Sequence, residues 1–167
     1  MEGETLLTFT VASWRLALPL ADVKRVLPLP VLEPPLGGPS FVEGFFDYQG
    51  APVAALRLDR MFGLEEEDLG VYSPLLLLEA RNLMVALHVS KVDGILNLGE
   101  RRAQPIGRNE TFNDCIVGRV ADRRGDTIYV LSREEFLLVE EGARVNALET
   151  MRKQRLGALQ SEHAHAG

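Results

Sequence analysis

The sequence FVEGFFDYQGAPVAALRL, from Phe41 to Leu58, carries the pattern that decides the fold. Two apolar-rich runs meet at Gln49 and Gly50. This pattern is typical of a β-hairpin, in which Gly50 supplies the positive φ that a tight turn requires. Such a hairpin could serve a barrel core, the mouth of a ligand site or a docking surface, so the surrounding sequence has to distinguish these roles.

Alternation along the first run separates its side chains into two faces, because successive residues of a strand point in opposite directions. One face would carry Phe41, Glu43, Phe45 and Asp47, and the other Val42, Gly44, Phe46 and Tyr48. The first face mixes aromatic and acidic groups. It therefore has the composition expected of an interface that is partly exposed to water.

Upstream of this hairpin, apolar alternation in Leu6–Val11 and Trp14–Leu20 predicts another hairpin. The sequence ADVKRV at 21–26 then predicts a short helical turn. The segment LPLPVLEPPLGGP at 27–39 holds five of the nine prolines. Since proline has no N–H group to donate, this segment is expected at a sheet edge, in a loop, or in both.

Downstream, the pattern predicts many short strands and few helices. The expected strands are 74–79, 83–92, 94–98, 115–121 and 127–131, with a polar surface loop over 99–114. Short helices are expected at 58–63 and after Ser132, and a final helix at 146–159. This order favours all-β barrels or sandwiches over a doubly wound sheet.

The sequence also contains a weak internal repeat. VAALRLDRMF at 53–62 resembles IYVLSREEFL at 128–137 in position and pattern. Each combines a strand with a short helix, so two related barrels would explain the similarity.

Composition narrows the classes of function. The chain has 167 residues, with 24 acidic and 18 basic side chains, and it lacks the dense basic stripe of a duplex nucleic-acid binder. Residues 1–4 do not resemble a signal peptide, and the longest apolar stretch, 74–78, is too short to span a membrane. The single Cys115 cannot form an internal disulfide, which fits a reducing cytoplasm.

The sequence shows no enzyme signature, and it predicts neither a cofactor nor a metal site. His88 stands alone in an apolar strand and is expected to be a partly exposed strand residue. Cys115 is expected to be an inert buried thiol. Turn and surface positions are expected for four carboxylates, Asp47, Asp59, Asp93 and Asp122.

Apolar residues near turns and edges favour a docking surface instead. Most of these residues are expected to lie in the core, and the rest would remain exposed. A small-molecule-binding β-barrel, or an enzyme that uses a groove between barrels, is the alternative of another class. A deep pocket with convergent polar groups would favour that alternative.

Three stretches of the chain resemble the CheW-like domain, the coupling module of bacterial chemosensory arrays. They are residues 16–63, 83–98 and 116–138, and they contain the motif order P-x-F-V-x-G, G-x-P-V and L-x-x-x-F-G. The resemblance implies two interlocked five-stranded SH3-like β-barrels. These would occupy roughly 15–65 and 70–140 of a domain over 1–140, with the N-terminal strand shared and a C-terminal helix and tail over 141–167.

The resemblance further implies a cytoplasmic scaffold without catalysis or a cofactor, recruited to membrane-associated receptor arrays. Two partners are implied. One is the CheW-like regulatory domain of a CheA-type histidine kinase, which the edge strands of each barrel would meet. The other is the cytoplasmic tip of a chemoreceptor helix bundle, held near the groove between the barrels.

The chain departs from the family pattern at two positions. Gln49 stands where an Asn-x-Arg-Gly turn usually has arginine, and Ser90 stands where a Val-Asp pair usually has aspartate. If those two family residues are partners, losing both avoids an unpaired charge. The departures indicate a divergent member with a specialised receptor, or an adaptor of type IV pilus motility or another non-flagellar pathway.

Apolar contact from 31–36 and 41–45 would anchor the receptor helix, with Gln49 at the margin. We therefore expect Leu32→Arg to abolish receptor binding while leaving thermal stability nearly intact. The full set of candidate interaction residues is Val31, Leu32, Leu36, Phe41, Glu43, Phe45, Gln49, Gly50 and Ser90.

Overall fold

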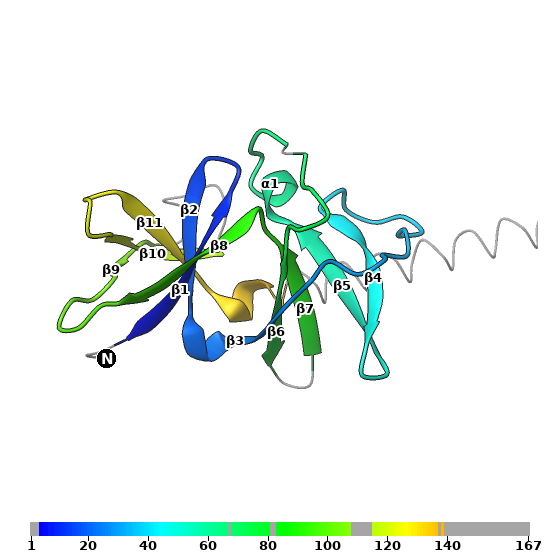
Figure 1. Cartoon of the computed structure of the whole chain (residues 1–167), viewed down its shortest axis with the longest axis horizontal. Coiled ribbons are helices and arrows are strands. Elements are labelled where there is room, and N and C mark those ends of the chain that lie inside the picture. Colours follow the sequence, from blue (N-terminus) through cyan, green and yellow to red (C-terminus); the bar gives the residue numbers. More distant parts are fainter. Residues whose placement is uncertain (1–3, 67, 81–82, 108–114, 137, 139–167) are drawn as a thin grey trace, which may run out of the picture.

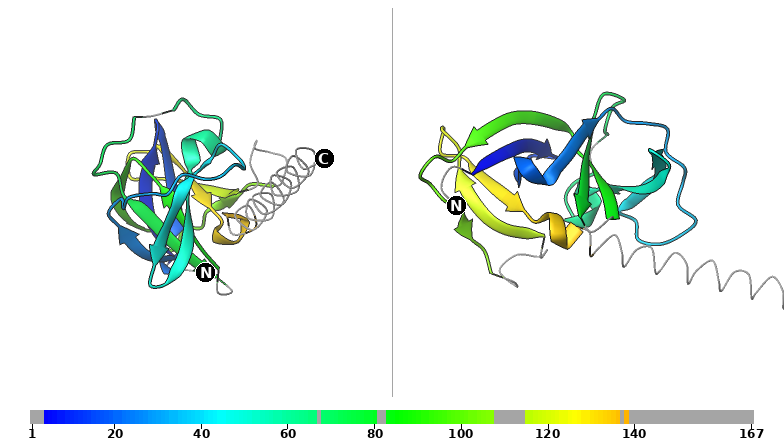
Figure 2. Two further views of the ribbon diagram at one scale, coloured as in Figure 1. Left: turned by 90° about the vertical axis from the view of Figure 1, so that its right-hand side faces the viewer. Right: turned by 90° about the horizontal axis from the view of Figure 1, so that it is seen from below.

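Two β-sheets form two lobes that lie side by side in the computed structural model (Figure 1 and Figure 2, right). The structure describes residues 4–66, 68–80, 83–107, 115–136 and 138. The predicted all-β class is confirmed. No helix in the described part of the chain has the length and apolar character needed to cross a membrane.

The six-stranded sheet has the order β8-β1-β2-β11-β10-β9. Among its described strands, β2 and β11 form the only parallel pair, and the N-terminal hairpin of β1 and β2 is confirmed. Its strands are β1 (Thr5–Val11), β2 (Trp14–Pro19), β8 (Lys91–Asn97), β9 (Gln104–Pro105), β10 (Ile116–Ala121) and β11 (Thr127–Leu131).

The five-stranded sheet has the order β3-β6-β7-β5-β4 and one parallel pair, β5 with β7. The hairpin of β4 and β5 confirms the prediction from Phe41–Leu58. The strands are β3 (Val23–Leu27), β4 (Val42–Tyr48), β5 (Ala51–Arg57), β6 (Leu75–Ala80) and β7 (Leu83–His88), with the short helices η1 (Leu20–Asp22) and α1 (Leu58–Met61) beside them.

The internal repeat of the sequence corresponds to a repeat in the fold. In each sheet, two hairpins meet at the parallel pair, and one strand of that pair, β5 or β11, leads into helical residues. The rings of Phe62 after α1 and Phe136 in the second helical turn have centroids 6.5 Å apart. The two repeats therefore meet at these two phenylalanine rings.

The chain divides between the sheets at other positions than expected. The five-stranded sheet uses residues 23–88, and the six-stranded sheet uses 5–19 and 91–131. The expected division lay near residues 65 to 70. The sheets differ from it because β6 and β7 pair with β3 and β5.

Three local predictions need correction. Helical turn η1 ends at Asp22, and Val23–Leu27 is strand β3, because it pairs with β6. The strand expected over 83–92 ends at His88, and β8 starts at Lys91. The loop expected over 99–114 includes the short strand β9. The predicted helix at 146–159 lies outside the described residues.

Three apolar clusters stabilise the two lobes. Each sheet has a core of its own, and a larger cluster joins the sheets through residues such as Phe9, Leu16 and Leu87. The run of leucines in β6 serves two of these cores. Leu76 and Leu78 belong to the joining cluster, while Leu75 and Leu77 belong to the core of the five-stranded sheet. A strand buried on both faces is expected to be apolar throughout.

A β-bulge changes the face assignment in β4. Its pairing with β5 shifts between Val42 and Gly44, so Glu43 is an extra residue. Val42 and Phe45 consequently both contact the joining cluster, whereas Phe46 belongs to the core of the five-stranded sheet. The predicted simple alternation along this strand is therefore wrong.

The proline-rich segment runs along the edge of the five-stranded sheet, as predicted. We call residues 27–36 the proline strap. Leu27, Leu29 and Leu32 pack against the core of the sheet. Glu33 and Phe45 exchange two backbone hydrogen bonds, with N to O distances of 2.8 and 2.9 Å. The strap therefore covers part of the open edge of β4, which would otherwise expose its backbone groups.

Gly44 allows the strap to lie this close to β4. A Cβ atom at residue 44 would lie 2.6 Å from the Glu33 carbonyl oxygen and 2.9 Å from Leu32 Cβ. We expect Gly44→Ala to destabilise the protein by about 1–3 kcal/mol, because two backbone segments have to separate. Urea denaturation measures this effect. Gly70→Ala is the matched control, since its Cβ would meet nothing within 4 Å, and an equal loss in both variants would contradict the prediction.

Candidate docking surface

The proline strap presents large apolar side chains to solvent. Val31 is 93% exposed and Leu36 is 69% exposed. Leu32 lies between them in sequence and is half-buried against the sheet core. The structure thus brings two of the three predicted strap residues to the surface, and places Leu32 where it contributes to folding.

Val31 lies beside the edge of β4. Together the strap and the hairpin form a shallow hollow of about 280 Å³, lined by Val31, Glu33, Phe45, Phe46, Asp47 and Pro52. Phe45 is half-buried and Asp47 is exposed. The hollow therefore combines an apolar wall with an acidic rim. Phe41 is half-buried against the joining cluster and does not line this hollow.

Gln49 and Gly50 form the exposed turn between β4 and β5. Both have positive φ, 52° and 86°, and the Gly50 N–H donates to Asp47 Oδ1 over 2.8 Å. The sequence identifies Gly50 as the positive-φ residue, and this is confirmed. Gln49 adopts the left-handed region as well, as the first central residue of a type I′ turn must.

Gln49 and Ser90 lie at opposite ends of the five-stranded sheet, so the hypothesis that they occupy partner positions is wrong. Gln49 precedes β5, whose last residue Arg57 pairs with His88, and Ser90 follows two residues later. The seven residues of β5 separate the two levels by about 20 Å at about 3.3 Å per residue. In Figure 1, the β4–β5 turn and the β7–β8 connection lie at opposite ends of this lobe.

His88 is buried, which corrects the expectation that it is partly exposed. Only 2% of it is accessible. Its Nδ1 lies 2.6 Å from Glu43 Oε2, and its Nε2 lies 2.6 Å from Ser73 Oγ. Since a carboxylate only accepts hydrogen bonds, Nδ1 donates to Glu43. A single histidine in an apolar strand is visible in the sequence, but its partners Glu43 and Ser73 come from distant segments.

The order serine, histidine, carboxylate also occurs in hydrolases, but here it holds a loop in place. Ser73 is 5% exposed, and its hydroxyl lies 2.5 Å from the Gly70 carbonyl oxygen. The Ser73 N–H donates to the same oxygen over 3.0 Å. These contacts close the turn from Gly70 to Ser73 and attach it to β4 and β7.

A buried ion pair lies next to the hydrogen bonds that join Ser73, His88 and Glu43. Arg57 Nη2 lies 2.6 Å from Asp59 Oδ2, and Arg57 Nη1 lies 3.8 Å from Glu43 Oε1. The hydrogen bond to Asp59 raises the pKa of Arg57, and burial opposes it. Asp59 is 1% exposed, so its predicted surface position is wrong. The Glu43 side chain, which is 22% exposed, thus connects these buried charges to the surface.

Two other predicted carboxylates lie together on the six-stranded sheet. Asp93 and Asp122 both line an open hollow of about 610 Å³, and Arg15 forms ion pairs with both. Burial raises the pKa of Asp122, but the N–H groups of Asp126 and Arg124 and the Arg15 guanidinium lower it more, so the net shift is downward. This carboxylate fixes the β10–β11 turn.

The described residues contain no group of three His, Cys, Asp or Glu side chains placed to hold a metal ion. Cys115 is 1% exposed, so its predicted burial is confirmed. The hollows found on this part of the chain are open to solvent, and neither His88 nor Cys115 lines those described above.

Comparisons with known proteins place the sequence and the fold in one group. The model of the CheW-like domain family matches residues 5–141. The crystal structure of the scaffolding protein TtCheW from Thermoanaerobacter tengcongensis matches with a TM-score of 0.71 and 18% identity, over 79% of this chain and 86% of that one. At this identity the likeness shows the fold alone. No curated protein sequence matches the chain.

Proposed function

Because this chain belongs to the CheW-like domain family, we propose that it is a non-enzymatic adaptor that couples chemoreceptors to a CheA-type histidine kinase. The exposed apolar side chains of the proline strap are the observation that carries this proposal. One of them, Val31, lines a shallow hollow instead of a deep pocket with convergent polar groups, which favours binding of a protein over binding of a small molecule.

The strap and the β4 edge form the receptor-binding surface. Val31 and Leu36 offer exposed apolar area, and Phe45 of β4 supplies an aromatic wall of the hollow that Val31 lines. A helix with an apolar stripe can cover such side chains. The strap is held by the Glu33–Phe45 backbone pairing and by the packing of Leu32, so little ordering is required on binding.

The kinase domain meets the exposed strands at the sheet edges. Strand β3 is one edge of the five-stranded sheet, and its Val26 is 45% exposed. Strand β8 is one edge of the six-stranded sheet, and its Ile95 is 57% exposed. Each lobe thus offers an apolar side chain on an edge strand, which suits contact with a homologous domain of the kinase.

The adaptor works in the cytoplasm at membrane-associated receptor arrays. Gln49 at the exposed hairpin turn cannot offer the permanent charge and five donors of arginine. This difference favours a specialised receptor, or a type IV pilus or other non-flagellar pathway, because the partner surface has to match a neutral side chain.

Binding measurements with purified partners test the proposal. The partners are a soluble cytoplasmic fragment of a chemoreceptor and the regulatory domain of a CheA-type kinase, each encoded in the same genome. We expect each partner to bind the immobilised chain in biolayer interferometry. Failure of every such receptor fragment and kinase domain to bind would contradict the proposal, and turnover of a metabolite by the purified chain would favour the enzymatic alternative.

A further inference from the structure

Five arginines lie in or beside strands β9 to β11 of the six-stranded sheet, although the whole chain has a net charge of −6. They come from the β8–β9 connection, from β10 and from the β10–β11 turn, and all are exposed. The described arginines of this group are Arg101, Arg102, Arg119, Arg123 and Arg124. This lobe does not carry the proline strap.

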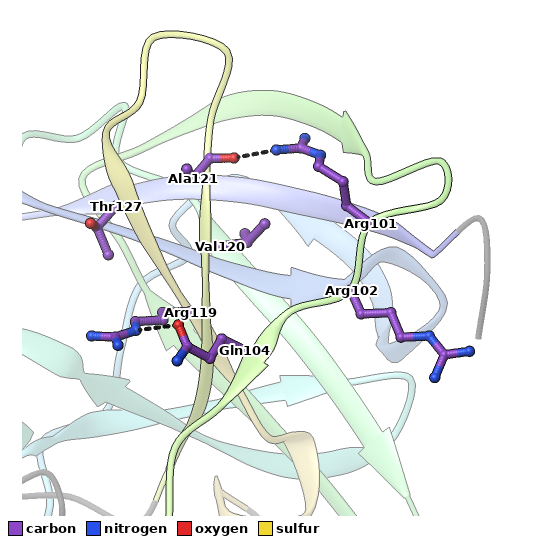
Figure 3. A pocket seen from close by; sticks show the side chains of 7 residues that line it. All are labelled: Arg101, Arg102, Gln104, Arg119, Val120, Ala121 and Thr127. Carbon is purple, nitrogen blue, oxygen red and sulfur yellow. Dashed lines mark hydrogen bonds between the residues drawn. The ribbon is translucent and has the colours of Figure 1, made fainter.

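Three of these arginines line an open groove of about 570 Å³, which we call the arginine groove (Figure 3). Its other lining residues are Gln104, Val120, Ala121 and Thr127. None of the described residues that line it is acidic, and Gln104 and Thr127 add neutral hydrogen-bonding groups. The lining therefore favours a negatively charged ligand.

Two of the guanidinium groups are held in place by the protein. Arg101 Nη1 donates to the Ala121 carbonyl oxygen over 2.8 Å, and Arg119 Nε donates to Gln104 Oε1 over 3.1 Å. Each bond uses one of the five guanidinium N–H donors and leaves the others free. Arg102 forms no hydrogen bond or ion pair within the described part of the chain. Its charge is thus available to a ligand.

The arrangement of the arginines indicates the shape of that ligand. In Figure 3, Arg119 and Arg102 extend to opposite sides of the groove, and Arg101 lies along its upper end. Their guanidinium groups do not converge on one point, as they would around a single phosphate. Several separate anionic groups on an extended chain match this arrangement better.

From these observations we propose that the arginine groove binds an acidic segment of a partner protein, with glutamate or aspartate carboxylates spaced along an extended peptide. Arg102 and Arg119 bind separate carboxylates, and Gln104 and Thr127 contact the peptide backbone. This site is separate from the proposed receptor and kinase contacts, because none of its lining residues belongs to the strap, to β3 or to β8.

Fluorescence anisotropy of the full chain with a labelled peptide of alternating glutamate and serine tests the proposal. We expect binding that weakens as salt is raised, and a loss of affinity of about tenfold or more in the Arg102→Gln/Arg119→Gln variant. Arg25→Gln is the matched control for Arg102→Gln. Arg25 is also exposed, but it lies on β3 outside the groove, and its loss should leave binding within twofold, as expected of a remote screened charge.

Three results would overturn this inference. The first is no binding of the glutamate–serine peptide by the wild-type chain at low salt. The second is an equal loss in Arg25→Gln and Arg102→Gln, which would indicate attraction to overall charge. The third is displacement of the peptide by inorganic phosphate at matched charge concentration, or stronger binding to phosphatidylglycerol vesicles, because either would assign the groove to another class of ligand.

Discussion

Arg57→Ala is expected to destabilise the protein by about 3–5 kcal/mol, which is the cost of removing one partner from a buried ion pair. The substitution leaves the Asp59 carboxylate, 1% exposed, without the guanidinium 2.6 Å away. It also removes the guanidinium group that lies 3.8 Å from Glu43, the carboxylate that orients His88. Urea denaturation followed by circular dichroism measures the change in unfolding free energy.

Arg60→Ala is the matched control for this prediction. Arg60 lies three residues after Arg57 and pairs with Glu66 over 2.7 Å at the surface. The loss of this surface pair should cost at most about 1 kcal/mol. The double variant Arg57→Met/Asp59→Leu should recover much of the lost stability, since no buried charge then lacks a partner. A small effect of Arg57→Ala, equal to that of Arg60→Ala, would show that the buried pair contributes little.

Val31→Asp combined with Leu36→Asp is expected to weaken receptor binding by at least about thirtyfold, the effect of losing about 2 kcal/mol at a central contact. Stability should change little, because both side chains are already exposed to water. Titration of a receptor fragment against the variant, together with a thermal melt, separates the two effects.

Val71→Asp is the control for the strap variant. Val71 is 76% exposed, but it lies in the turn between Gly70 and Ser73 and does not belong to the strap. Its substitution should leave receptor affinity unchanged. If the strap variant bound the receptor as tightly as wild type, the strap would not be the receptor-binding surface.

The structure changes what is expected of Leu32→Arg. The sequence pattern treats the three apolar strap residues alike and predicts unchanged stability. Leu32, however, packs against the core of the five-stranded sheet. We therefore expect Leu32→Arg to reduce stability as well as binding, so it cannot test the docking surface by itself.

Local patterns predict the hairpins of this fold well. Alternation in Leu6–Val11 and the turn at Gln49–Gly50 each specify pairing between neighbouring strands, and both hairpins form. The parallel pairs of β2 with β11 and of β5 with β7 join segments far apart in sequence. Local periodicity does not encode such pairing, and this is why the division of the chain between the sheets differs from the expected one.

The site was less predictable than the fold because single residues decide it. One bulge residue, Glu43, brings Val42 and Phe45 to the same cluster, and alternation cannot reveal it. His88 is buried because Glu43 and Ser73, from two other segments, satisfy its ring nitrogens. The exposure of Val31 follows from the proline-rich composition, which keeps the strap out of the sheet interior.

Simultaneous binding of both partners tests the central claim most directly. Sedimentation velocity of the chain mixed with the kinase regulatory domain and a receptor cytoplasmic fragment should show a species containing all three proteins, because the proposed surfaces do not overlap. The Val31→Asp/Leu36→Asp variant should lose the receptor and keep the kinase domain. Competition between the two partners for the wild-type chain, or no complex with either, would contradict the account.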